Sequence, residues 1–137
     1  ERHTGVRTFV HDGWVILVGK NASDNDRLST KIGNPEDFWF HVHGAPGSHV
    51  VVRNPTKESD LPREVKTVAA GLAAWYSKSR KASKANVHYT KCKFVKKIPG
   101  SPVGQVLLSN YKPISTGPVN PESVSKPKPA PKSAPKA

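Results

Sequence analysis

Three histidines within nine residues are the side chains of this sequence best suited to chemistry. His41 and His43 stand two positions apart in an alternating stretch, and His49 follows shortly after. Alternate residues of a strand face the same side, and a hairpin would place His49 opposite the other two. Three imidazoles near a carboxylate, here Glu36 or Asp37, would suit zinc, but histidines also stack on bases, donate to phosphates or simply fix a hairpin. Because His-x-His spacing is only weakly specific for metal, a nucleic-acid surface or a purely structural role is favoured over zinc.

A glycine-rich segment separates the histidines. Gly44-Ala45-Pro46-Gly47-Ser48 predicts a tight turn between two strands, and its backbone N–H groups, with the Ser48 hydroxyl, could receive a phosphate. It is not a nucleotide-binding Walker loop, because no Gly-Lys-Ser/Thr follows. Catalysis by Ser48 with His49 is disfavoured, since neighbours along a strand point to opposite faces. A turn that needs glycine only for its conformation remains the alternative for Gly47.

Basic residues dominate the second half of the sequence. Residues 1–77 carry nine Lys/Arg and nine Asp/Glu, whereas residues 78–137 carry thirteen Lys/Arg and one acid, so the whole net charge of +12 lies there. Its densest part, residues 78–97, contains no acid and includes aromatic rings, the combination that single-stranded or looped RNA requires. We therefore predict nucleic-acid contacts from its cations, which are Lys78, Arg80, Lys81, Lys84, Lys91, Lys93, Lys96 and Lys97.

The elements that must position these groups are short strands and one clear helix. Asp12-Gly13 predicts a hairpin between 8–11 and 14–18, and a second hairpin is expected at 38–43 and 49–53. Apolar residues at helical spacing predict a helix from 61 to about 81, and a short helical segment is expected over 22–31. Further strands are expected at 86–90, 93–98 and 104–110. The fold class is therefore α+β, a single domain with a mainly antiparallel sheet and one principal helix.

The carboxyl-terminal stretch differs in composition from the rest. From residue 113 it is rich in proline, lysine and alanine and poor in large apolar groups, which predicts a domain over 1–112 and a disordered basic tail over 113–137. Cys92 is the only cysteine, so no intrachain disulfide can form. No apolar run reaches the roughly 18 residues of a membrane span. We therefore expect a cytoplasmic protein with no membrane partner.

Several motifs resemble those of one known family, the NFACT-R domain, over roughly residues 5 to 112. They include 37–43 with Pro46-Gly47-Ser48-His49-Val50, then 13–22, 25–28, 73–80, 95–97 and 104–106. The resemblance implies an RNA-binding module of proteins in ribosome-associated quality control. It also makes Asn25 and Arg27 candidate contacts, although capping and local hydrogen bonds would explain these residues equally well. The amino-terminal domain and coiled-coil arms of a full-length NFACT protein are absent from this sequence.

These observations predict a non-enzymatic RNA-binding module that engages tRNA or ribosomal RNA, including RNA of the ribosome itself, and needs no cofactor. One alternative is a DNA-binding version of the module, because phosphate contacts do not distinguish the two polymers. The other is a metal-dependent nucleic-acid hydrolase built on His41, His43, His49 and Asp37. Neither the particular RNA nor the oligomeric state follows from the sequence.

Overall fold

The first hairpin forms as its turn residues predict. Strands β1 (Val6–His11) and β2 (Trp14–Gly19) pair antiparallel from Val6 with Gly19 to His11 with Trp14. Asp12 and Gly13 between them have φ of 49° and 81°, the left-handed conformation that a tight hairpin turn needs. This computed structural model describes residues 5–127.

A six-stranded antiparallel sheet organises the domain, which confirms the α+β class. Its order is β1-β2-β4-β3-β5-β8, where β3 is Phe38–Val42, β4 is Val50–Val52, β5 is Ala85–Lys91 and β8 is Lys112–Thr116. The expected second hairpin is present, with Phe40 opposite Val50. The other edge of β3 pairs with β5, so β3 and its His41 lie near the middle of the sheet.

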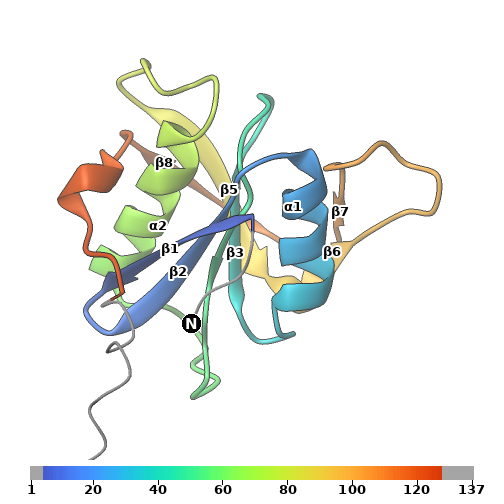
Figure 1. The fold of residues 1–137 in the computed structure, drawn as a ribbon, viewed down its shortest axis with the longest axis horizontal. Helices are drawn as coiled ribbons and strands as arrows, with labels where there is room; N and C mark the ends of the chain where they lie inside the picture. Colours follow the sequence, from blue (N-terminus) through green and yellow to red (C-terminus); the bar gives the residue numbers. More distant parts are fainter. Residues whose placement is uncertain (1–4, 128–137) are drawn as a thin grey trace, which may run out of the picture.

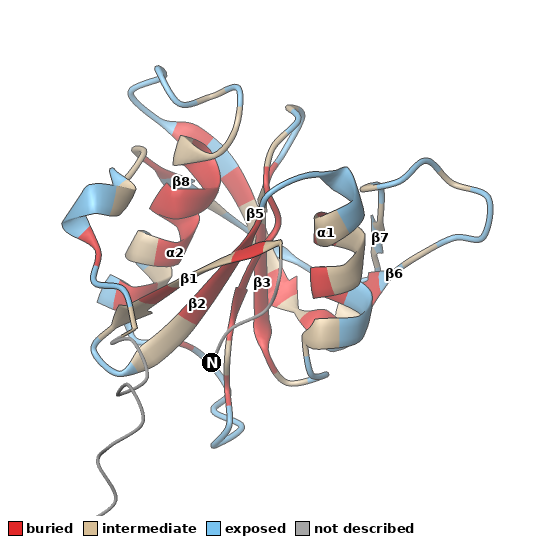
Figure 2. Cartoon of the chain, in the orientation of Figure 1, coloured by how far each residue is buried: buried red, intermediate tan, exposed pale blue. Residues whose placement is uncertain are grey.

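Helices and a small second sheet cover the two faces of the main sheet (Figure 1). On one face, Phe40 and Val87 form a buried cluster with Val65 and Leu72 of helix α2 (Arg63–Trp75). The other face is covered by α1 (Ala22–Arg27), the π-helical turn η1 (Leu28–Ile32) and the two-stranded sheet of β6 (Val95–Lys96) and β7 (Leu107–Leu108). A second buried cluster lies there, and Figure 2 shows the central strands buried between the layers.

Several expected bounds were wrong. Helix α2 ends at Trp75 rather than near 81, because Tyr76 leaves helical geometry with ψ of 37°. The strands expected at 93–98 and 104–110 shrink to β6 and β7, and the 3-10 turn η2 (Cys92–Phe94) precedes β6. Within residues 5–127, no helix has the length and apolar character that a membrane crossing requires.

The expected domain boundary after residue 112 also needs correction. Strand β8 pairs with β5, and the following segment crosses α2 to the opposite edge of the sheet, where Ser125 bridges Val10. This segment includes the 3-10 turn η3 (Pro121–Ser123), and its Val124 is buried in the main core. Its prolines are compatible with this path because an extended edge segment does not need every backbone donor. Residues 128–137 of the expected tail lie outside the described residues.

Gly71, in the middle of α2, is where the carboxyl-terminal segment touches the helix. A Cβ built on Gly71 would lie 2.2 Å from Cγ2 of Val119, whose backbone N–H donates to the Gly71 carbonyl. Alanine normally stabilises a helix interior relative to glycine by about 0.5–1 kcal/mol. Here we predict the reverse: Gly71→Ala should lower the free energy of unfolding by about 1–3 kcal/mol because it overpacks this contact.

Chemical denaturation of three variants tests this prediction. Combining Gly71→Ala with Val119→Ala should recover part of the loss, because the smaller side chain at 119 makes room for the new methyl group. Val119→Ala alone supplies the reference for the cycle. A stabilising Gly71→Ala would mean that residues 117–125 do not pack on α2 in solution.

Candidate nucleic-acid interface

The turn between β3 and β4 is held by the side chain of Asn25. Its Nδ2 donates to the Gly47 carbonyl at 3.2 Å, and its Oδ1 accepts from the His49 backbone N–H at 3.0 Å. Ser48 Oγ donates to the Gly19 carbonyl at 2.6 Å. Asn25 and Ser48, both expected to contact RNA, are buried. Their side chains instead form the local hydrogen bonds that fix the turn.

The same turn is joined to the loop after α2. The Ser48 N–H donates to the Tyr76 carbonyl at 2.9 Å, and the Lys78 N–H donates to the Pro46 carbonyl at 3.1 Å. A Cβ on Gly47 would lie 2.6 Å from Cβ of Ser77, so glycine is required here for close approach of two backbones. The glycine turn and the start of the basic run therefore lie side by side.

His49 is an internal residue and not a surface contact. The Trp39 indole N–H donates to Ser29 Oγ at 2.8 Å, which leaves the Ser29 hydroxyl hydrogen free to donate to His49 Nδ1 at 2.7 Å. Nδ1 is therefore the acceptor of a neutral ring. Burial lowers the pKa of His49 to about 3, with the nearby His41 adding to the effect. This corrects its expected role as an RNA contact.

His41 and His43 lie on the sheet face opposite α2, the shared face that their spacing predicts. The half-buried His41 ring stands 5.0 Å from that of His49, and burial lowers the pKa of His41. His43 is exposed and stacks on His88 at 4.2 Å, and His88 in turn stacks on Tyr111 at 4.1 Å. We call His43, His88 and Tyr111 the ring stack. It borders a pocket of about 400 Å³ that His41 and His49 also line.

The metal-hydrolase alternative does not fit this geometry. Asp37 is buried at the start of β3, at the end away from the turn, where it pairs with Arg53 at 2.9 Å and accepts the Asn54 N–H at 2.8 Å. Within residues 5–127, the His, Cys, Asp and Glu side chains close enough to share one ion are a different set: His11, Asp12 and Glu64. That set is exposed or half-buried, and an imidazole–carboxylate hydrogen bond of 3.0 Å between His11 and Glu64 accounts for it.

The basic run 78–97 does not form one surface. The run continues along β5, whose seven residues extend roughly 20 Å from the glycine turn to the far end of the sheet. At that far end Glu36 pairs with Lys91 at 2.6 Å and Lys93 at 2.8 Å, and both lysines lower the pKa of Glu36 to about 2. The run itself contains no acidic residue, but another segment of the chain thus provides an acidic partner for these two lysines.

Two further candidate contacts also have acidic neighbours. Lys97 pairs with Asp26 of α1 at 3.1 Å, and Arg27 lies 3.7 Å from Asp24. Lys96, by contrast, is exposed on β6. The charge that Lys97 and Arg27 present to a ligand is therefore partly offset.

Cations without an acidic partner gather around the glycine turn instead. Lys78, Arg80, Lys81 and Lys84 are exposed in the loop between α2 and β5, which lies next to the β3–β4 turn at one end of the molecule (Figure 1). Arg7 stacks over the Tyr76 ring at 4.6 Å, and exposed Lys20 lines the same hollow as Arg7 and Tyr76. Among residues 5–127, no acid lies within ion-pair distance of these cations. We call this set the basic surface: Arg7, Lys20, Lys78, Arg80, Lys81 and Lys84.

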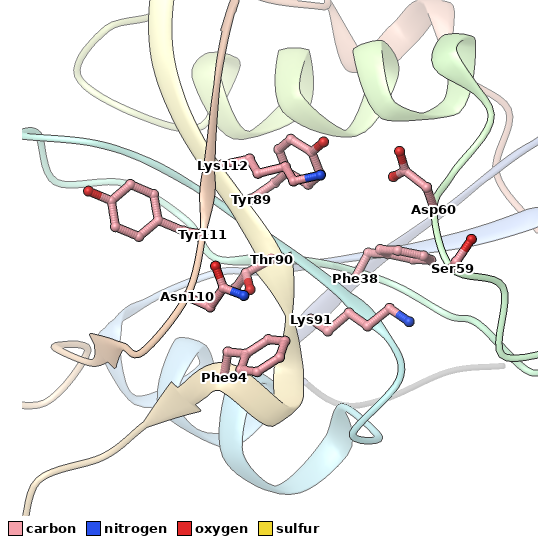
Figure 3. A pocket seen from close by; sticks show the side chains of 10 residues that line it. All are labelled: Phe38, Ser59, Asp60, Tyr89, Thr90, Lys91, Phe94, Asn110, Tyr111 and Lys112. Carbon is pink, nitrogen blue, oxygen red and sulfur yellow. The ribbon is translucent and has the colours of Figure 1, made fainter.

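A second pocket, of about 350 Å³, opens beside β5 and the start of β8 (Figure 3). Phe38, Tyr89 and Phe94 supply its rings, and Lys91 and Lys112 supply cations. In Figure 3 the ring of Tyr111 points away from Phe38 and Asp60. Tyr111 thus joins the ring stack and only borders this second pocket.

Sequence reasoning missed Arg7, Lys20 and Tyr111. Arg7 and Lys20 lie in the electrically neutral half of the chain, and only the order of the strands brings them to the basic loop. Tyr111 reaches His88 because β8 pairs with β5, with Pro113 opposite His88. No local spacing signals either juxtaposition, since both depend on non-local strand pairing.

Comparison with known proteins gives consistent matches. The family described as "NFACT protein RNA binding domain" matches residues 6–110. The Rqc2 homolog RqcH of Bacillus subtilis (strain 168) is 40% identical over 94 residues, which cover 69% of this chain and 16% of that protein. Coiled-coil domain-containing protein 25 of Bos taurus is 35% identical over 104 residues, covering 74% of this chain and 50% of that protein.

A solved structure has the same fold. It is the C-terminal part of the fibronectin/fibrinogen-binding protein from Streptococcus suis, with a TM-score of 0.80 and 35% sequence identity. The match covers 91% of this chain and 50% of that one. This chain therefore spans half or less of each of these three proteins.

The buried His49 predicts that stability depends on pH. Its folded pKa, about 3, lies below the ordinary 6.5, so the unfolded chain takes up a proton first as the pH falls. Between pH 8 and pH 5 this histidine should cost up to about 2 kcal/mol of unfolding free energy. Urea unfolding at both pH values should show a clearly smaller loss in His49→Asn. An equal loss in the two proteins would contradict the neutral, buried assignment.

Proposed function

The chain belongs to the NFACT RNA-binding domain family, and on that premise we propose that it binds RNA as a non-enzymatic module through the basic surface. The observation that carries the proposal is the gathering of cations without acidic partners around one rigid turn. They come from β1, the end of β2 and the loop after α2, segments that are far apart in the sequence. Cations collected in this way favour a polyanion, because each phosphate contact releases bound counterions.

The glycine turn supports close approach of a phosphate backbone. Gly44 is exposed with φ of 77°, and a Cβ built there would meet nothing within 4 Å. The turn is fixed on both sides, by Asn25 and by the loop after α2, so little conformational entropy would be lost on binding. Of the expected hairpin contacts, this leaves exposed His43, half-buried His41 in the adjoining pocket and the outer edge of the turn as the groups that can reach RNA.

We propose tRNA or ribosomal RNA as the partner, on the cytoplasmic ribosome and in ribosome-associated quality control. The support is the family membership and the similarity to the Rqc2 homolog RqcH. In this proposal Lys96 adds a further contact. Lys91, Lys93 and Lys97 contribute less because Glu36 and Asp26 already pair with them.

Salt dependence tests the basic surface. Binding to a single-stranded RNA should weaken with salt, and each lost phosphate contact should reduce the slope of log K against log salt by about 0.7. The double variant Lys78→Gln, Lys81→Gln should therefore lower the slope by about 1.4. Fluorescence anisotropy at several salt concentrations gives this slope directly.

A charge-matched control separates local contact from overall charge. Lys31→Gln with Lys57→Gln also removes two exposed lysines, but from η1 and from the loop after β4. The control should keep the slope of the parent protein. Equal losses in both double variants would mean that net charge alone drives binding, and absence of RNA binding at low salt would refute the proposal. Equal affinity for a DNA strand of the same sequence would instead favour a nucleic-acid module without RNA preference.

A further inference from the structure

The ring stack is a column of three nearly parallel rings on the protein surface. His43 and His88 are 15° from parallel and His88 and Tyr111 are 19° from parallel, with centroids 4.2 and 4.1 Å apart. His88 therefore lies between the other two, and both end rings keep an outer face. His43 is exposed, and Tyr111 is 48% exposed although it is a large aromatic side chain.

The surroundings of this column suit a planar, hydrogen-bonding ligand. The adjoining pocket of about 400 Å³ is within the usual size range of small-ligand sites, about 300–1,000 Å³. One wall carries the ring stack with His41, and residues of the loop before β7, Gln105 among them, form another. Histidine and glutamine side chains can donate and accept hydrogen bonds along the edge of a base.

A phosphate-binding group lies near the column. Exposed Lys84 directly precedes β5, which carries His88. Lys112 follows Tyr111 in the sequence but lines the second pocket with Tyr89 (Figure 3). The backbone N–H of His43 donates to the Asn86 carbonyl at 2.8 Å, which fixes the backbone at His43 next to the start of β5. A strand whose phosphates follow the basic surface would thus bring its bases to the rings.

We propose that the ring stack binds unpaired nucleobases, so that this domain prefers single-stranded or looped RNA to duplex. A base extends the column at the outer face of Tyr111 or of His43 while the flanking phosphates contact Lys84 and the rest of the basic surface. This inference rests on the proposed RNA binding and adds the class of RNA. Stacking on aromatic rings tolerates any base, so the preference is for unpaired bases and not for one sequence.

The decisive comparison is between an intact RNA strand and the same strand with several abasic positions, because the two have identical phosphates. The parent protein should bind the intact strand about fivefold to a hundredfold more tightly. Tyr111→Ala should abolish most of this preference, whereas Tyr111→Phe, which keeps the ring, should retain it. Val103→Ala, at a 60% exposed apolar residue outside the pocket, is the matched control and should also retain it.

A second variant and a second signal keep the test independent of folding. His43→Ala removes the exposed ring at the other end of the column and should reduce the same preference. A 2-aminopurine placed in the strand should lose fluorescence on binding to the parent protein and to Tyr111→Phe, and less so on binding to Tyr111→Ala. Thermal unfolding of each variant establishes that it is folded.

The outcomes separate this inference from the function on which it rests. Salt-dependent binding of equal strength to intact and abasic strands would overturn the ring-stack inference and leave RNA binding by the basic surface intact. Equal losses for Tyr111→Ala and Tyr111→Phe would likewise overturn it. No binding to either strand at low salt would defeat the proposed function itself.

Discussion

The carboxamide of Asn25 is the interaction on which the arrangement of this surface depends. It bonds to two backbone groups of one turn, Gly47 and His49, and so fixes the turn to α1. A Cβ on Gly19 would lie 2.1 Å from the Asn25 oxygen, so β2 must have a glycine for the amide to fit. The same turn also holds the loop after α2, through backbone hydrogen bonds of Ser48 and Lys78. Removing a buried amide whose hydrogen bonds are all formed is costly, because several backbone groups are then left without partners.

The polar residues in and around the hairpin have two different roles. Asn25, Ser48 and His49 are buried and hold the turn, and His49 stays neutral for the same reason. The cations around the turn are exposed, apart from the half-buried Arg7, and His43 is the exposed histidine of the hairpin. Charge for a polyanion and rings for its bases therefore come from neighbouring but different segments. Because the turn is already fixed by hydrogen bonds, RNA binding has to order only the lysine side chains, which keeps the entropic cost of binding low.

Local patterns predicted much of the fold. Asp12-Gly13, the alternation around His41 and the apolar stripe of α2 each specify structure within a few residues, and the hairpins and helix follow from them. The proline-rich composition after residue 112 was misleading, because Val119 and Val124 are enough to hold this segment across α2. In the candidate site, the basic loop could be predicted from residue type alone. The pairing of Lys91 and Lys93 with Glu36, and the stacking of Tyr111 on His88, depend on strand order, which local sequence patterns do not reveal.

The most direct test of RNA binding at this end of the molecule is an NMR titration of the ¹⁵N-labelled protein with a short single-stranded RNA. Binding at the basic surface and the ring stack should shift backbone amide signals mainly in the turn 43–48, in the loop 76–84 and around His88, and added salt should reverse these shifts. The Asp12-Gly13 turn and the loop 54–60 should remain unchanged, since the basic surface does not include them. Shifts centred on those two segments, or around Glu36 and Lys93, would show that RNA does not bind at the basic surface.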